Sequence, residues 1–213
     1  MTGATGQAPL LSPDSVLHRA AERLAHQFTG MVSEETVERV VFESHATLAR
    51  GARIRNHLPS LALKFAADRL RALERGEGGK PDGAVRILVE SIRNDGISQM
   101  AAAYLNALGE GRVEALSAAV SPADEVLRTV ADVMEEDGVP LTDSFPKPVT
   151  DDVARAADVI VTMLIEHPFE LVPGQRIESW DYDDPAGRGT DEVRRIRDRV
   201  RRRVQEYLDT LPA

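Results

Sequence analysis

The side chains best suited to chemistry are concentrated in one short segment, residues 90–95, between a predicted strand and a predicted helix. This segment reads Glu-Ser-Ile-Arg-Asn-Asp, so carboxylates, a hydroxyl, an amide and a guanidinium lie close together in the chain. Such a mixture favours a pocket for a molecule that has both cationic and anionic parts. Purely structural roles are the alternative, because Gly96 suits a turn with positive φ and Ser98 suits a helix N-cap.

A carboxylate near the C-terminus and a turn near the N-terminus are further candidates for a polar site. Asp184 lies in the loop Tyr-Asp-Asp-Pro-Ala-Gly and could act as a general acid or base, or could simply shape the turn. Arg53, Arg55 and His57 lie between two predicted helices. They could face the same pocket, although a solvated turn would also explain them.

Thiol and metal chemistry find no support in the sequence. The chain has no cysteine, so a thiolate nucleophile, a disulfide and a zinc-thiolate site are excluded. The other histidines are widely separated and lack the spacing of metal ligands: His18, His26, His45 and His167. We therefore predict no metal site and no cofactor.

The pattern of apolar residues divides the chain into two predicted domains. Residues 1–78 contain three amphipathic segments with short connections, which predicts a small antiparallel helical bundle. A Gly-rich linker follows, and in residues 79–213 strand-like and helical segments alternate, which predicts an α/β domain with a parallel sheet. The predicted helices are at 12–27, 33–51, 59–76, 98–108, 124–137 and 190–211, and the predicted strands at 84–89, 112–117 and 157–163.

The composition favours a soluble protein that does not bind nucleic acid. A formal net charge of −9 opposes non-specific attraction to phosphate backbones. The dense basic run at residues 194–203 alternates with apolar residues, as expected of the solvated face of a terminal helix. No apolar run approaches the roughly 18 residues of a membrane helix, and the N-terminus lacks the features of a signal peptide. We therefore expect a cytoplasmic protein.

Residues 87–100 resemble the active-site loop of arsenate reductases with the low-molecular-weight tyrosine phosphatase fold. In that family, a strand ends in a Cys-x5-Arg-Ser/Thr loop that opens a helix. Asn94, Gly96 and Ser98 keep this register. Ser91 stands at the cysteine position and Ile97 at the arginine position.

The resemblance extends over residues 84–211 and keeps its order. Further matches lie at residues 117–126, 143–163 and 179–187, and the last of these implies that Asp184 takes the place of the family's general acid. The predicted N-terminal helical bundle resembles a domain fused to actinobacterial members of the family, because a stretch similar to residues 52–59 occurs there. The implied fold is a phosphatase-I-like parallel sheet flanked by helices, preceded by a three-helix bundle.

The resemblance also implies that the family's chemistry is lost. In the family a thiolate attacks the substrate, while backbone N–H groups and the arginine hold the oxyanion. Ser91 is a poor nucleophile, because a hydroxyl is far less acidic than a thiol and this loop has no histidine to act as a base. The change to Ile97 should weaken oxyanion binding by about 2–5 kcal/mol. Glu90 and Asp95 add like charges near the loop, which Arg93 could offset in part.

The reductases also use further cysteines, which form a disulfide as arsenate is reduced, and this chain has no cysteine. Arsenate reduction by that route is therefore excluded, and phosphotyrosine hydrolysis is not expected.

Two functions remain. We favour a repurposed lyase, cyclase or transferase-like enzyme that binds a small polar metabolite. It would assist the loss of sulfate or phosphate by elimination or cyclisation, in a specialised biosynthetic pathway. The alternative is a non-catalytic ligand sensor or structural subunit, and both functions allow a homo- or hetero-oligomer. The predicted catalytic residues are Glu90, Ser91, Arg93 and Asp184, and the predicted ligand-binding residues are Asn94, Asp95, Gly96, Ser98, Arg53, Arg55 and His57.

Overall fold

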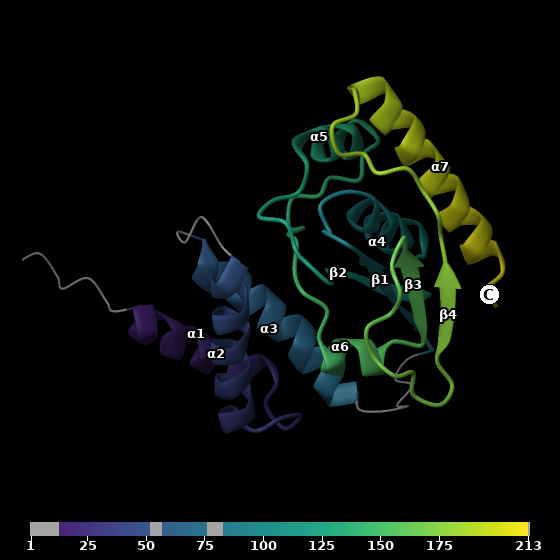
Figure 1. Ribbon diagram of the computed structural model, residues 1–213. Helices are drawn as coiled ribbons and strands as arrows, with labels where there is room; N and C mark the ends of the chain where they lie inside the picture. The colour runs from purple at the N-terminus through teal and green to yellow at the C-terminus, as the bar shows by residue number, and fades with distance from the viewer. Residues whose placement is uncertain (1–12, 52–56, 76–82, 213) are drawn as a thin grey trace, which may run out of the picture.

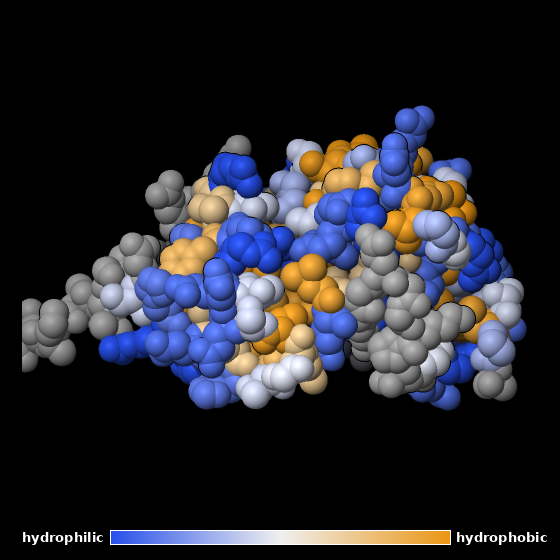
Figure 2. Space-filling view, turned by 90° about the horizontal axis from the view of Figure 1, so that it is seen from below, coloured by the Kyte–Doolittle hydropathy of each residue, from blue (hydrophilic) through white to orange (hydrophobic). Residues whose placement is uncertain are grey.

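The N-terminal part of the protein is helical. The computed structural model describes residues 13–51, 57–75 and 83–212 (Figure 1). Helices α1 (Pro13–Gln27), α2 (Glu34–Gly51) and α3 (Leu58–Arg75) bury their apolar stripes against one another. Hydrophilic residues cover much of this bundle in the view from below, where it lies on the left (Figure 2). Its buried core consists of Leu17, Ala21, Leu24, Phe28, Val37, Val40, Val41, Ala66 and Leu70.

The rest of the described chain alternates between strands and helices. The strands are β1 (Val85–Ser91), β2 (Val113–Ala119), β3 (Val159–Met163) and β4 (Arg176–Ser179), and the helices are α4 (Ile97–Leu108), α5 (Arg128–Glu136), α6 (Asp151–Ala156) and α7 (Thr190–Asp209). The four strands form a parallel sheet in the order β2-β1-β3-β4. The prediction of an N-terminal helical bundle followed by a parallel α/β fold is confirmed. None of the helices in the described ranges is long and apolar enough to cross a membrane.

Three details of the predicted elements were wrong. Strand β4 was missed because it is a largely exposed edge strand without an apolar run. Helix α6 was missed because it has only 6 residues, too few for a periodic pattern. Helix α5 begins at Arg128, since residues 120–127 instead hydrogen-bond to the loop that follows β1.

Both faces of the sheet are covered, and β1 lies at its centre. Side chains alternate along a strand, so Ile87 and Val89 contribute to the core under α4, α5 and α7, whereas Leu88 faces α3 and α6 (Figure 1). This alternation places neighbouring residues at the end of β1 in different environments.

Polar contacts join the helical bundle to the α/β part. The Arg69 guanidinium on α3 donates to Asp152 of α6 at 2.8 Å and to Glu43 of α2 at 3.0 Å. Lys147 lies 3.5 Å from Asp68, and its backbone N–H donates to the Asn94 side chain. The bundle is therefore connected, through Lys147, to the loop that follows β1.

Candidate functional site

The loop between β1 and α4 is held along one side by backbone hydrogen bonds. Residues 120–127, which follow β2, donate N–H groups to its carbonyl oxygens. Ser121 donates to Ile92 and Ala123 to Arg93, both at 2.9 Å, and Leu127 donates to the Asp95 carbonyl at 2.8 Å. These bonds fix the path of the loop and leave its own N–H groups for other partners.

Asn94 organises the interior of the loop. It is fully buried and has a φ of 54°, a left-handed conformation that asparagine tolerates better than most residues. Its Nδ2 donates to Ser98 Oγ at 3.0 Å, and its Oδ1 accepts from Gln99 Nε2 at 3.0 Å and from the Lys147 N–H at 3.2 Å. Because the side chain is fully engaged, we assign Asn94 to holding the loop.

Ser91 lies between two potential donors at the base of the loop. Its Oγ is 2.7 Å from Ser98 Oγ and accepts from the Asn94 N–H at 3.0 Å. Both groups could donate to a negatively charged atom at this position. The prediction that Ser98 caps α4 was wrong, because the N-cap is Gly96 and Ser98 turns inward to Ser91 and Asn94.

A cavity of about 70 Å³ lies over the loop. Several waters or one small charged group would fit, since a water needs roughly 10–15 Å³ of such space. Among the described residues, the N–H groups of Arg93, Asp95 and Gly96 donate to no protein acceptor, as expected of a loop shaped to hold an anion. The lining residues are Ser91, Ile92, Arg93, Asp95, Gly96, Ile97, Met163, Leu164, Asp184 and Pro185.

The cavity combines one guanidinium with two carboxylates. Arg93 Nε donates to Asp95 Oδ2 at 2.8 Å, and this hydrogen bond raises the pKa of Arg93 further above its ordinary value, with a smaller contribution from the charge of Asp184. Arg93 is about half exposed, whereas Asp95 is nearly buried. The Asp184 carboxylate accepts the Ala186 N–H through Oδ1 at 2.9 Å. A ligand with both positive and negative groups fits this arrangement.

Gly96 is required by packing. The expectation of a positive φ was wrong, since its φ is −147°. A Cβ at this position would approach Pro185 Cγ to 2.5 Å, so any larger residue would displace the segment that carries Asp184. The glycine thus lets the Asp184–Pro185 segment close over the loop.

Glu90 does not face the cavity, contrary to the prediction. Ser91 points into the cavity, and its neighbour on the strand therefore points to the other face of the sheet. There the Glu90 carboxylate is fully buried and lies 2.9 Å from His167 Nδ1. Glu90 Oε1 and His167 Nε2 are buried and have no partner among the described residues. Sequence reasoning missed this pair because 77 residues separate its members.

Substitution of Glu90 by glutamine is expected to stabilise the protein increasingly as the pH rises. Burial raises the pKa of Glu90 above its ordinary value of 4.5, although the contact with His167 acts in the opposite direction. A carboxyl with a raised pKa stabilises the fold fully below its ordinary value, and this contribution is lost as the pH rises through the folded-state value. Glutamine does not titrate, so the gain in unfolding free energy for Glu90→Gln should grow as the pH rises from the ordinary value of 4.5 through the folded-state value. Urea denaturation across that range measures it, and a pH-independent difference would contradict this account.

The other predicted site residues lie elsewhere. His57 is exposed immediately before α3 and does not line the cavity. Arg53 and Arg55 fall outside the described residues. The structure thus brings together five of the predicted residues around the cavity: Ser91, Arg93, Asp95, Gly96 and Asp184.

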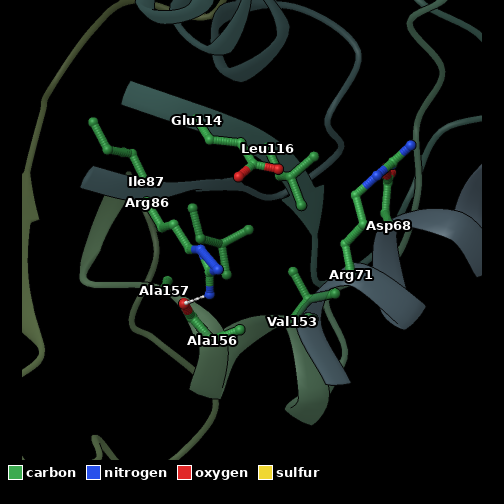
Figure 3. A pocket seen from close by; sticks show the side chains of 11 residues that line it. Asp68, Arg71, Arg86, Ile87, Glu114, Leu116, Val153, Ala156 and Ala157 are labelled. Carbon is green, nitrogen blue, oxygen red and sulfur yellow. Dashed lines mark hydrogen bonds and ion pairs between the residues drawn. The ribbon is translucent and has the colours of Figure 1, made fainter. Parts of the chain in front are cut away.

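A smaller cavity of about 40 Å³ lies between the helical bundle and the sheet (Figure 3). Its lining comes from α3, β1, β2 and α6 and is mainly apolar. The Arg86 guanidinium donates to the Ala156 carbonyl at 3.0 Å at one side of it. We assign this cavity to imperfect packing between the two parts.

Comparison with known proteins gives matches over both parts of the chain. Residues 17–74 match the protein-tyrosine-phosphatase-like N-terminal domain model, and residues 86–213 match the low molecular weight phosphotyrosine protein phosphatase model. The solved thioredoxin-dependent arsenate reductase of Corynebacterium glutamicum is 36% identical with a TM-score of 0.81, over 94% of this chain and 98% of that one. A solved arsenate reductase in a phosphate-binding state is 25% identical with a TM-score of 0.55, over 60% of this chain and 99% of that one. The glutaredoxin arsenate reductase of Synechocystis is 28% identical over 126 residues, which are 58% of this chain and 95% of that one.

Proposed function

The chain belongs to the low molecular weight phosphotyrosine protein phosphatase family, and from that premise we propose that it uses the family's loop without the family's cysteine chemistry. The absence of cysteine removes the thiolate nucleophile, and Ile97 lines the cavity where the family pattern has an arginine. In place of reduction or phosphoester hydrolysis, the loop would hold the sulfate or phosphate group of a small polar metabolite in a cytoplasmic biosynthetic pathway.

The composition of the 70 Å³ cavity carries this proposal. A loop that served only as a connection would not need a buried left-handed Asn94, a Gly96 packed under Pro185, and free N–H groups around a cavity with charged side chains in its lining. Arg93 and Asp184 offer groups of opposite charge to the same small space. These features suit a ligand with an oxyanion and a nearby amine or hydroxyl.

The proposed reaction needs no protein nucleophile. An internal amine or hydroxyl of the substrate attacks the carbon that bears the sulfate or phosphate, and a new nitrogen–carbon or oxygen–carbon bond forms. The carbon–oxygen bond to the leaving group breaks, and its electron pair leaves with the sulfate or phosphate. Arg93 and the loop N–H groups stabilise the charge that develops on the leaving group, while the Asp184 carboxylate takes the proton of the nucleophile. Holding both ends of the substrate together supplies the remainder of the acceleration.

Arg93→Ala and Asp184→Asn are each expected to abolish this activity without changing the melting temperature. The assay is the release of inorganic sulfate from a 2-aminoalkyl sulfate, with both variants expected to lose at least about 100-fold in rate. Arg128→Ala and Asp183→Asn are matched controls, because neither residue lines the cavity. Full activity in either cavity variant would refute the assigned roles.

A non-catalytic role is the second candidate, and one observation favours it. The Arg93 guanidinium is already engaged by Asp95, so the cavity offers an anion less positive charge than the family's arginine would. In that case the chain would be a ligand sensor or one subunit of a hetero-complex. Purification of the tagged full chain from its native host, with a partner in equal amount that Arg93→Ala and Asp184→Asn both retain, would favour this function over catalysis.

A further inference from the structure

Three large apolar side chains are exposed in or next to the segments that form the 70 Å³ cavity. Ile92 and Leu164 line it with exposed fractions of 49% and 52%. Val120 is 46% exposed, and its N–H donates to the Ser91 carbonyl at 3.3 Å. Single exposed apolar residues are ordinary on a protein surface, but their collection beside a cavity that Arg93, Asp95 and Asp184 also line points to a ligand with an apolar part.

Leu164 is also held in an unusual backbone conformation. Its φ is 60°, in the left-handed region that leucine rarely adopts. Such strain persists only where the surrounding structure enforces it, and it is concentrated at functional sites. The strained turn after β3 brings Leu164 to the cavity that Ser91 and Asp184 also line.

A larger cavity of about 400 Å³ lies beside the segment that follows β2. It is bounded by α2, α3 and the segment after β2, and Leu48, Leu58, Leu61 and Phe145 contribute apolar side chains to its lining. Val120 lines this larger cavity, and its N–H donates to the carbonyl of Ser91, which lines the smaller one. The volume of the larger cavity falls in the range of cavities that hold small organic molecules, roughly 300–1,000 Å³.

The two cavities share one wall. Ser121 and Ala123 line the larger cavity, and their N–H groups donate to the carbonyls of Ile92 and Arg93, which line the smaller one. The wall is therefore a pair of hydrogen-bonded segments, about 5 Å across, which a molecule a few carbons long can cross.

From these observations we propose that the substrate is amphipathic, which rests on the proposed function of the small cavity and extends it. Its polar head, a sulfate or phosphate beside an amine or hydroxyl, lies in the 70 Å³ cavity. Its aliphatic or aromatic body crosses Ile92 and Val120 and lies in the 400 Å³ cavity against the helical bundle. The bundle thereby forms part of the substrate site and selects for the apolar body.

A series of sulfate monoesters tests this proposal on the full chain by isothermal titration calorimetry. The probes are inorganic sulfate and methyl, butyl and hexyl sulfate, none of which is long enough to form micelles at the concentrations used. We expect Kd to fall by about threefold to fourfold for each methylene beyond methyl, as the transfer of a methylene from water implies. Val120→Asn and Leu61→Gln should flatten this series and leave the Kd of inorganic sulfate unchanged. Ile177→Asn is the control, because this exposed residue of β4 lines neither cavity.

The outcomes separate this inference from the function on which it rests. If inorganic sulfate binds and the alkyl sulfates bind no more tightly, the amphipathic substrate is refuted and the proposed function survives. If no sulfate binds, both fail. A chain-length effect that persists in Val120→Asn and Leu61→Gln, with unchanged melting temperatures, would also overturn the assignment of the larger cavity.

Discussion

The double variant Ser91→Cys/Ile97→Arg is expected to hydrolyse p-nitrophenyl phosphate at a rate at least about 100-fold above that of either single variant. At position 91, the Asn94 N–H and the Ser98 hydroxyl lie 3.0 and 2.7 Å from the serine oxygen. Both can donate to a thiolate, which would lower the pKa of the new thiol from roughly 8.5. An arginine at position 97, where Ile97 now lines the cavity, would hold the phosphate with two hydrogen bonds.

The single variants separate the effect of the missing cysteine from the effect of the missing arginine. Ser91→Cys restores a nucleophile without an anion clamp, and Ile97→Arg restores the clamp without a nucleophile. Adding Asp184→Asn to the double variant should remove most of the gain, because the leaving phenol derivative then lacks its proton donor. A folded double variant with a thiol of lowered pKa and no hydrolysis would show that more than two side chains separate this loop from an active one.

Asn94→Ala is expected to lower stability by about 2–4 kcal/mol, a fall of roughly 5–15 °C in melting temperature for a chain of this size. The substitution leaves Ser98, Gln99 and the Lys147 N–H without their buried partner and places alanine at a φ of 54°. Differential scanning calorimetry measures the fall. The same variant should also lose sulfate binding, because the cavity depends on the path of the loop.

Two further substitutions at Asn94 distinguish strain from lost hydrogen bonds. Asn94→Gly relieves the backbone strain and should be less destabilising than Asn94→Ala by about 1 kcal/mol. Asn94→Asp keeps the oxygen that accepts from Gln99 and Lys147 and should be the mildest of the three. If alanine is tolerated as well as aspartate, Asn94 does not organise the loop as described.

Local patterns in the sequence were sufficient to predict the fold and its family. Short apolar runs between helical segments marked β1, β2 and β3, because strands buried on both faces of a parallel sheet are largely apolar. Helical periodicity marked the three N-terminal helices. The resemblance placed Ser91 and Ile97 at the cysteine and arginine positions, and the family membership is confirmed. The resemblance also placed Asp184 with the loop, as the family's general acid, and in the structure Asp184 lines the same cavity.

Features that depend on contacts between residues far apart in the chain could not be predicted from the sequence. The side to which Glu90 points follows from strand alternation, but its partner His167 comes from a loop after β3 that has no periodic signal. Gly96 looked like a turn glycine, whereas Pro185 determines its identity from 89 positions away. The 400 Å³ cavity exists only because the helical bundle packs against the segment after β2. Packing between separate helices and strands produces no pattern within a single stretch of residues, so it cannot be predicted from local sequence.

Titration of inorganic sulfate into the ¹⁵N-labelled chain, followed by NMR, measures whether the loop between β1 and α4 binds an oxyanion. If the loop still holds an oxyanion without its cysteine, the amide signals of Arg93, Asp95 and Gly96 should shift together and reach saturation with one Kd. Arg93→Ala should raise that Kd by about tenfold or more, and Arg128→Ala should leave it unchanged. Loop amide signals that stay in place at saturating sulfate, or that shift equally in Arg93→Ala, would contradict the account.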